Sequence, residues 1–115
     1  MEREPRLQTD FWVTAYVRRC SVEGGAAFVV RRGNAEAGVV LIKLNHLNGE
    51  FAVLARSRDL DGNLVWRQAT GAAPVEEAAA DLYVEKQVNF DPDLWVIEVE
   101  DRDGRHFLDE PVAED

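Results

Sequence analysis

Two segments of the chain repeat apolar residues at helical spacing. In the first, Thr9 and Asp10 are residue types that cap helix N-termini, and Gly24-Gly25 suits the left-handed end of a helix. The apolar positions between them follow the i, i+3, i+4 spacing of one helical face: Trp12, Val13, Tyr16, Val17 and Cys20. Aromatic and β-branched residues also suit a strand, but the capping pattern favours a helix.

The second helical segment follows Pro74. Proline is common in the first turn of a helix, and Glu76 and Glu77 would complement the helix dipole there. One apolar stripe continues from this turn and could pack on a sheet. Asp91-Pro92 predicts the end of the helix, because the residue before a proline disfavours helical geometry.

Five segments have the composition and alternation of strands. They are residues 26–32, 39–44, 51–54, 64–67 and 94–100. The segment 39–44 is apolar at successive positions, which predicts a central strand covered on both faces. Asn48-Gly49 and Asp61-Gly62 are hairpin turn sequences, so an antiparallel meander of three or four strands is expected. A short returning strand is also expected at residues 105–108.

Together these elements predict one α+β domain spanning residues 1–115. We expect an antiparallel sheet of four to five strands, formed by the meander and the C-terminal strand, with two helices packed on it in two layers. We expect residues 1–8 and 109–115 to be loose tails. A chain of 115 residues can bury one core without disulfides or metal.

The N-terminus and the cysteine content bear on the cellular compartment. The first six residues are mostly charged and do not resemble a signal peptide, and no run of about 18 apolar residues would span a membrane. Cys20 is the single cysteine, so no intramolecular disulfide can form. These features predict a cytoplasmic protein that does not bind membranes.

Charge is distributed unevenly along the chain. Residues 1–58 contain nine Lys and Arg against six Asp and Glu, a net +3, whereas residues 59–115 contain four against sixteen, a net −12. The overall charge of −9 makes nucleic acid an unlikely partner. A solvated acidic face is the simplest interpretation, with a basic protein partner as the alternative.

Two arginine pairs are the main candidates for a binding site. Arg18 and Arg19 lie in the first predicted helix, and Arg31 and Arg32 end the first predicted strand. If the helix packs beside this strand, the four guanidinium groups could meet and bind a phosphate or carboxylate. The alternative is internal pairing with acidic residues of the final strand and the turn after it: Glu98, Glu100, Asp101 or Asp103.

Other arrangements give weaker evidence for chemistry. Asp101, Asp103, Gly104 and Glu110 match four positions of a calcium-binding loop, but Val99 occupies the first position and has no oxygen ligand to offer. A catalytic thiol would need Cys20 together with His46 or His106, yet Cys20 continues the apolar stripe of its helix. We therefore expect no catalytic residues, no metal site and no cofactor.

Three segments carry a resemblance to a known family. They begin at Thr9 (TDFWVTAYVRRC), Val29 (VVRRGNAEAG) and Phe90 (FDPDLWVIEVEDRDGRHFL). They resemble a family of short alphaproteobacterial proteins of unknown function, domain family fourteen-ninety-one. The resemblance covers essentially the whole chain and implies a bacterial protein that forms a whole domain by itself. It implies no activity.

Three functional hypotheses follow. The first is a non-catalytic protein-interaction or adaptor module whose partner is unknown and which could form a homodimer through an exposed strand edge. The second is an anion or nucleic-acid binder using the four arginines, and the third is an enzyme using Cys20 and a histidine. The absence of catalytic and metal motifs favours the first.

Overall fold

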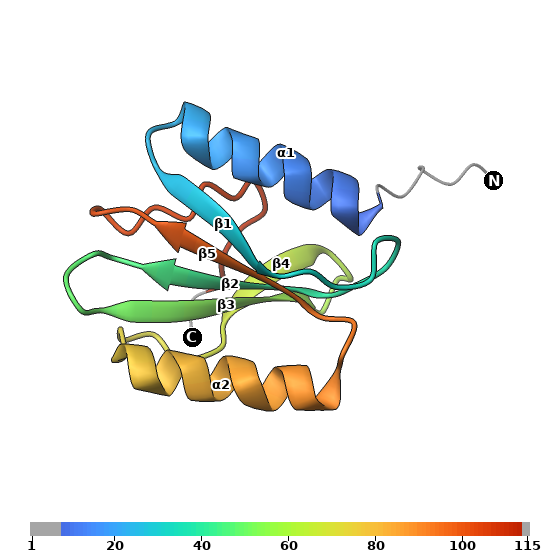
Figure 1. The fold of residues 1–115 in the computed structure, drawn as a ribbon. Helices are drawn as coiled ribbons and strands as arrows, with labels where there is room; N and C mark the ends of the chain where they lie inside the picture. Colours follow the sequence, from blue (N-terminus) through green and yellow to red (C-terminus); the bar gives the residue numbers. More distant parts are fainter. Residues whose placement is uncertain (1–7, 114–115) are drawn as a thin grey trace.

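The computed structural model describes residues 8–113. Within this range the chain forms two helices and one five-stranded sheet (Figure 1). In chain order the elements are α1 (Thr9–Val22), β1 (Ala26–Arg31), β2 (Val40–Asn45), β3 (Phe51–Arg58), β4 (Leu64–Gln68), α2 (Glu77–Phe90) and β5 (Trp95–Glu100). The α+β class is confirmed.

The order of the strands differs from the expected meander. The sheet runs β1-β5-β2-β3-β4, so β5 lies between β1 and β2. It pairs antiparallel with β1 and parallel with β2, which makes the sheet mixed and corrects the antiparallel prediction. β4 connects to β5 through α2, and a helical crossover of this kind can return a strand parallel to an earlier one. β2, β3 and β4 form an antiparallel meander of three strands, within the expected three or four.

The loop between β1 and β2 crosses the start of β5 instead of closing a hairpin. The indole N–H of Trp95 donates to the carbonyl of Asn34 at 2.8 Å, and the backbone N–H of Asn34 donates to the carbonyl of Asp93 at 2.9 Å. Gly38 packs so closely here that a Cβ would lie 2.6 Å from the Asp93 carbonyl oxygen. The glycine-rich loop therefore fits tightly over β5.

The two helices cover opposite faces of the sheet, as Figure 1 shows, so the expected two layers are in fact three. Alternation along β2 explains this arrangement, since successive side chains point to opposite faces. Ile42 packs in the cluster that includes Tyr16 of α1, and Leu41 packs in the cluster that includes Ala80 of α2. β2 is buried at successive positions, so each of its faces is covered by a helix.

The α1 boundaries also correct one prediction. The helix begins at Thr9 after Gln8, with no side-chain cap, and the Thr9 hydroxyl donates to the carbonyl of Gly38 at 3.1 Å. Thr9 therefore ties the helix to the β1–β2 loop. The C-terminal prediction is confirmed, because Gly24 has a φ of 97° and the Gly25 N–H donates to the Cys20 carbonyl at 2.9 Å.

The two edges of the sheet differ in whether another segment of the chain covers them. On the β4 side, the Trp66 N–H donates to the Pro111 carbonyl at 2.9 Å, and the Ala113 N–H donates to the Trp66 carbonyl at 2.7 Å. This corrects our expectation of a loose C-terminal tail for residues 109–113; residues 1–7, 114 and 115 lie outside the described range. The expected strand at residues 105–108 does not form. On the β1 side, no described segment hydrogen bonds to the outer edge.

A buried lysine connects the sheet to α2. Lys43 of β2 is 8% exposed, and its Nζ lies 2.6 Å from Asp81, 2.9 Å from Glu77 and 3.5 Å from Glu98. Burial alone would lower the pKa of Lys43, but the hydrogen bonds that Lys43 donates to Asp81 and Glu77 outweigh it and hold the pKa above its ordinary value. Glu98, named above as a possible partner for the arginine pairs, is instead part of this ion cluster.

We predict that Lys43→Met destabilises the domain by about 2–4 kcal/mol, because it leaves the half-buried Glu98 without its cation. Lys86→Met, on the exposed part of α2, should change stability by no more than about 0.5 kcal/mol. Urea unfolding at neutral pH measures both. Equal effects of the two substitutions would contradict a structural role for the cluster. The pKa of Lys43 is higher in the folded than in the unfolded chain. Its contribution to the free energy of unfolding should therefore be complete below the unfolded pKa and decline only at higher pH.

Candidate functional site

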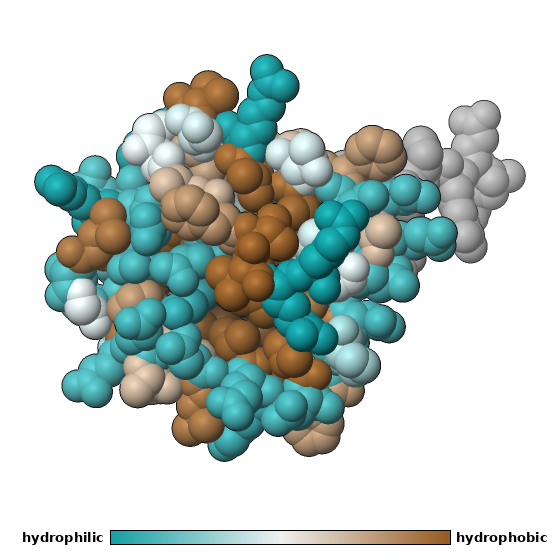
Figure 2. Space-filling view, in the orientation of Figure 1, coloured by the Kyte–Doolittle hydropathy of each residue, from teal (hydrophilic) through white to brown (hydrophobic). Residues whose placement is uncertain are grey.

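The outer edge of β1 combines an open backbone with exposed apolar side chains. Phe28 is 52% exposed, Val29 is 45% exposed and Val30 is 62% exposed. Figure 2 shows an apolar patch in the middle of the view, which runs from the region where Figure 1 places β1 down towards α2. Natural proteins usually protect such an edge with charges, proline or a covering segment. Three consecutive exposed apolar residues on an open edge indicate a contact surface.

Opposite charges lie at the two ends of this edge. Glu23 caps the C-terminus of α1 just before β1, and its side chain forms no salt bridge within residues 8–113. Arg31 ends β1 and Arg32 follows it. A β-bulge after Val29 leaves Val30 without a partner on β5; pairing is regular from Ala26 to Val29 and resumes where Arg31 pairs with Val96.

The structure does not bring the four predicted arginines together. Arg19 donates to the Phe107 carbonyl at 2.9 Å and forms a salt bridge of 3.0 Å with Asp109. Arg31 donates to the Pro92 carbonyl at 2.8 Å, and the guanidinium of Arg32 lies 5.2 Å from the ring centroid of Trp95. Arg18 is exposed.

The two arginine pairs lie near opposite ends of β5. Arg31 and Arg32 contact residues at the start of this strand, whereas Arg19 contacts the segment that follows its end. Six residues of strand span roughly 17 Å, too far for the two pairs to share one small anion. The expected internal pairing with acids of the final strand does not form either, since Arg19 pairs with Asp109.

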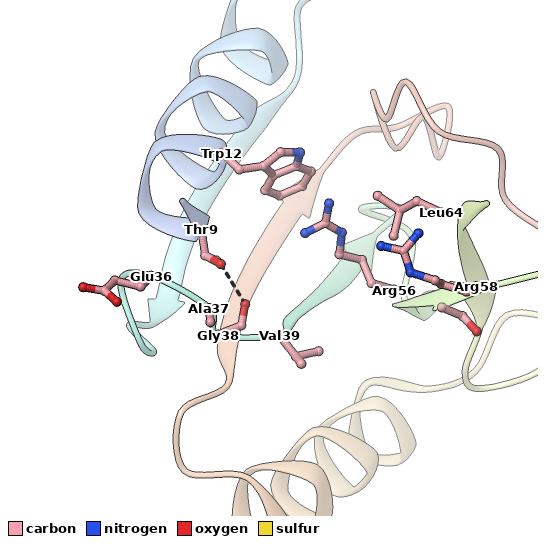
Figure 3. Close-up of a pocket in the computed structure, with 10 residues that line it drawn as sticks. Thr9, Trp12, Glu36, Ala37, Gly38, Val39, Arg56, Arg58 and Leu64 are labelled. Atoms are coloured by element: carbon pink, nitrogen blue, oxygen red, sulfur yellow. Dashed lines mark hydrogen bonds between the residues drawn. The ribbon is translucent and has the colours of Figure 1, made fainter. Parts of the chain in front are cut away.

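A cavity of about 410 Å³ lies between the start of α1, the loop that joins β1 to β2, and the end of β3. Figure 3 shows the side chains that surround it, with the guanidinium groups of Arg56 and Arg58 side by side and that of Arg56 directed towards Trp12. Its lining residues are Thr9, Trp12, Glu36, Ala37, Gly38, Val39, Arg56, Ser57, Arg58 and Leu64. Its walls therefore include two cations and several apolar groups.

Arg56 lies against a stacked pair of tryptophan rings, Trp12 and Trp66, whose centroids are 5.7 Å apart. Its guanidinium lies 5.1 Å from the ring centroid of Trp12 and 5.7 Å from that of Trp66. Its Nε is buried and has no hydrogen-bond partner in the described structure. Burial lowers the pKa of Arg56, Glu110 opposes this effect, and the neighbouring charge of Arg58 lowers the pKa further. The two guanidinium groups therefore repel one another.

The sequence analysis missed Arg56 and Arg58, although the pattern could have identified them. Leu54, Arg56 and Arg58 alternate along β3, so they share one face of the sheet. Leu54 is in the α1-side core, and two arginines continue its face beyond that core. Of the three tryptophans in the sequence, Trp66 and Trp95 are buried, but Trp12 is half-buried and lines the cavity.

The thiol proposed for catalysis lies in the core. Cys20 is fully buried in the α1-side cluster, and burial raises the pKa of its thiol. The Tyr16 hydroxyl on the preceding turn donates to the His106 carbonyl at 2.6 Å, while His106 Nδ1 accepts from the Leu108 N–H at 3.0 Å. Burial also lowers the pKa of His106. These groups serve packing and loop anchoring.

We therefore predict that Cys20 does not react with iodoacetamide at neutral pH in the folded protein. Its alkylation should be at least about 1,000-fold slower than in urea, because the thiol is reached only on unfolding. Mass spectrometry over time measures the rate. Alkylation of the folded chain at the rate of a free thiol would contradict the burial of Cys20 and support the hypothesis of an enzyme that uses this cysteine.

The residues that resembled a calcium loop stabilise a turn. Asp101 is 5% exposed and accepts two hydrogen bonds from the Arg105 side chain, at 2.8 and 3.1 Å, and one from its backbone N–H at 2.8 Å. These bonds from Arg105 lower the pKa of Asp101 to about 2. Within residues 8–113 no group of three or more potential ligands from His, Cys, Asp and Glu is placed to hold a metal.

This turn should make stability depend on pH in acid. Because the folded pKa of Asp101 lies below its ordinary value of 3.8, its contribution is present above pH 3.8 and lost as the pH falls towards 2. We predict that Asp101→Asn lowers the melting temperature at pH 6 and flattens its decline between pH 4 and pH 2. Asp103→Asn, an exposed neighbour, is the control. Identical acid profiles for the wild type and Asp101→Asn would contradict the assignment.

Comparisons with known proteins agree on one family. Residues 7–109 match the model of DUF1491, described as a protein of unknown function. A crystal structure of a DUF1491 family protein from Caulobacter crescentus is similar, with a TM-score of 0.86 and 42% identity over 94% of this chain and 100% of that one. An NMR structure of a DUF1491 family protein from the same organism gives 0.82 and 41% over 96% and 99%.

A more distant structure has the same fold. The solution structure of protein Atu0922 from A. tumefaciens has a TM-score of 0.71 and 25% identity over 84% of this chain and 86% of that one. No curated protein matches the sequence. Neither helix of the described chain is long and apolar enough to span a bilayer.

Proposed function

Because the chain belongs to the DUF1491 family, whose function is unknown, we propose from its own surface that it is a protein-interaction module. The module binds through the outer edge of β1, and its partner there is a second copy of the same chain. The pairing is antiparallel and isologous, so that two five-stranded sheets join edge to edge.

The difference between the two sheet edges supports this proposal most strongly. The edge of β4 hydrogen bonds to residues 111–113, whereas the backbone of β1 faces away from every described segment on its outer side. Phe28, Val29 and Val30 also remain about half exposed or more. Since the β4 edge is covered and the β1 edge is open and apolar, the β1 edge is the one suited to binding a partner.

The charges at the ends of β1 favour a second copy in antiparallel orientation. If the strands pair about an axis near Phe28 and Val29, Arg31 and Arg32 of one copy lie beside the segment that contains Glu23 of the other. A parallel arrangement would instead place like charges together. The short regular segment before the bulge predicts a small interface and a weak dimer, with a dissociation constant of about 1–100 µM.

We further propose that the module is non-catalytic and cytoplasmic. Burial of Cys20 supports the first point, because the only thiol of the chain is within the core. The single cysteine supports the second. The net charge of −9 argues against nucleic acid as the partner.

Sedimentation velocity over a concentration series tests the proposal. The wild type should shift from a 12.9 kDa monomer to a species of twice that mass. Val30→Lys and Phe28→Lys place a charge on the edge and should weaken the dimer at least about tenfold. Both side chains are about half exposed or more, so the fold should persist, which circular dichroism can check.

Leu82→Lys is the matched control. Leu82 lies on α2 and is 54% exposed, close to the value for Phe28, but it is not on the β1 edge. This variant should dimerise like the wild type. A wild type that remains monomeric at about 1 mM, or equal weakening by Leu82→Lys, would contradict pairing through β1.

A further inference from the structure

We infer that the cavity between α1 and β3 binds a small organic anion, whose phosphate or carboxylate lies against Arg56 and Arg58 and whose apolar body lies against Trp12, Val39 and Leu64. This site is independent of the interface proposed above. The cavity lies beside β3 and β4, while the proposed interface lies on β1 at the opposite edge of the sheet.

Unused hydrogen-bond donors provide the first argument. The buried Nε of Arg56 has no partner among the described residues, and a buried donor without a partner is costly. Arg58 donates from Nη1 to the Gly62 carbonyl at 2.8 Å. Neither guanidinium forms a salt bridge within residues 8–113, although the chain contains 22 acidic residues. A guanidinium group that has no carboxylate partner within the protein can bind the phosphate or carboxylate of a ligand.

Electrostatics provides the second argument. Arg56 and Arg58 share one face of β3 two residues apart, and their charges repel. Glu110 lies close enough to favour the charged form of Arg56, but its carboxylate already accepts from the Trp66 indole at 3.0 Å. Glu36 lines the rim, and Figure 3 shows its carboxylate directed away from the two arginines. An anion between the guanidinium groups would relieve their repulsion.

The size and lining of the cavity define the class of ligand. A volume of about 410 Å³ is within the range of small-molecule pockets. Val39 is 45% exposed and forms an apolar wall together with Leu64 and the half-buried Trp12. The first amides of α1 do not contribute, since the Thr9 and Asp10 N–H groups donate to the carbonyls of Glu36 and Ala35. Recognition of the charge therefore depends on the arginines.

Phenyl phosphate is a suitable probe because it combines a phosphate group with an apolar ring. Inorganic phosphate and phenol represent each of these two parts alone. Binding can be followed by NMR titration of the ¹⁵N-labelled full-length chain. The indole N–H groups of Trp66 and Trp95 are hydrogen bonded to Glu110 and Asn34, so the Trp12 indole is the remaining reporter of the cavity. We expect phenyl phosphate to shift the Trp12 and Arg56 N–H signals and to bind more tightly than either part. Benzoate tests whether a carboxylate can replace the phosphate.

Arg58→Gln should weaken binding of phenyl phosphate at least about tenfold, because it removes one guanidinium without disturbing the stack of Arg56 on the tryptophans. Arg67→Gln is the control: it removes the same charge from β4, where Arg67 donates to the Tyr83 hydroxyl at 3.1 Å. Phenol binding as tightly as phenyl phosphate, equal weakening by both substitutions, or no shift at the Trp12 and Arg56 signals up to about 10 mM would each overturn the inference.

Discussion

The structure depends on the position of β5 between β1 and β2. This strand is buried on both faces, with Trp95, Ile97 and Val99 directed towards α1 and Glu98 towards the Lys43 cluster beneath α2. α1 covers apolar side chains of β5 and β2, and α2 covers apolar side chains of β2 and β3. Without β5 between them, β1 would have no partner strand and α1 would lose part of the surface on which it packs.

The same arrangement leaves the two sheet edges unequal. Insertion of β5 moves β1 to one edge, while the segment after β5 returns along the α1 face and residues 111–113 cover β4. The C-terminal segment cannot also reach β1 on the opposite side of the sheet. An open, apolar β1 is thus a consequence of the topology, and pairing with another chain is the natural way to satisfy its backbone groups.

Local sequence patterns predicted most elements but not their order. Glycine turns, alternation and Asp91-Pro92 placed both helices and all five strands, because these depend on neighbouring residues. The insertion of β5 depends on contacts between distant segments, such as Trp95 with the loop at Asn34, which no local pattern contains. The opposite placement of the helices follows from the two-faced burial of β2, a feature that the sequence did show.

Candidate binding residues were harder to predict for a similar reason. Arg18, Arg19, Arg31 and Arg32 were selected as neighbours in sequence, yet β5 separates the two pairs in space. Arg56 and Arg58 were not predicted as a site, because they are not adjacent in the sequence and lie beyond the predicted end of their strand at residue 54. Their meeting with Trp12 depends on how α1 crosses the sheet. Charge content alone therefore did not locate the cavity.

Amide hydrogen exchange at two protein concentrations tests the central claim, that β1 is the binding edge, most directly. The account predicts that the outward amides of β1 exchange rapidly in dilute solution and become protected at high concentration. The Trp66 amide, which is bonded to Pro111 within the same chain, should be protected equally at both. Exchange in β1 that does not depend on concentration would contradict the account.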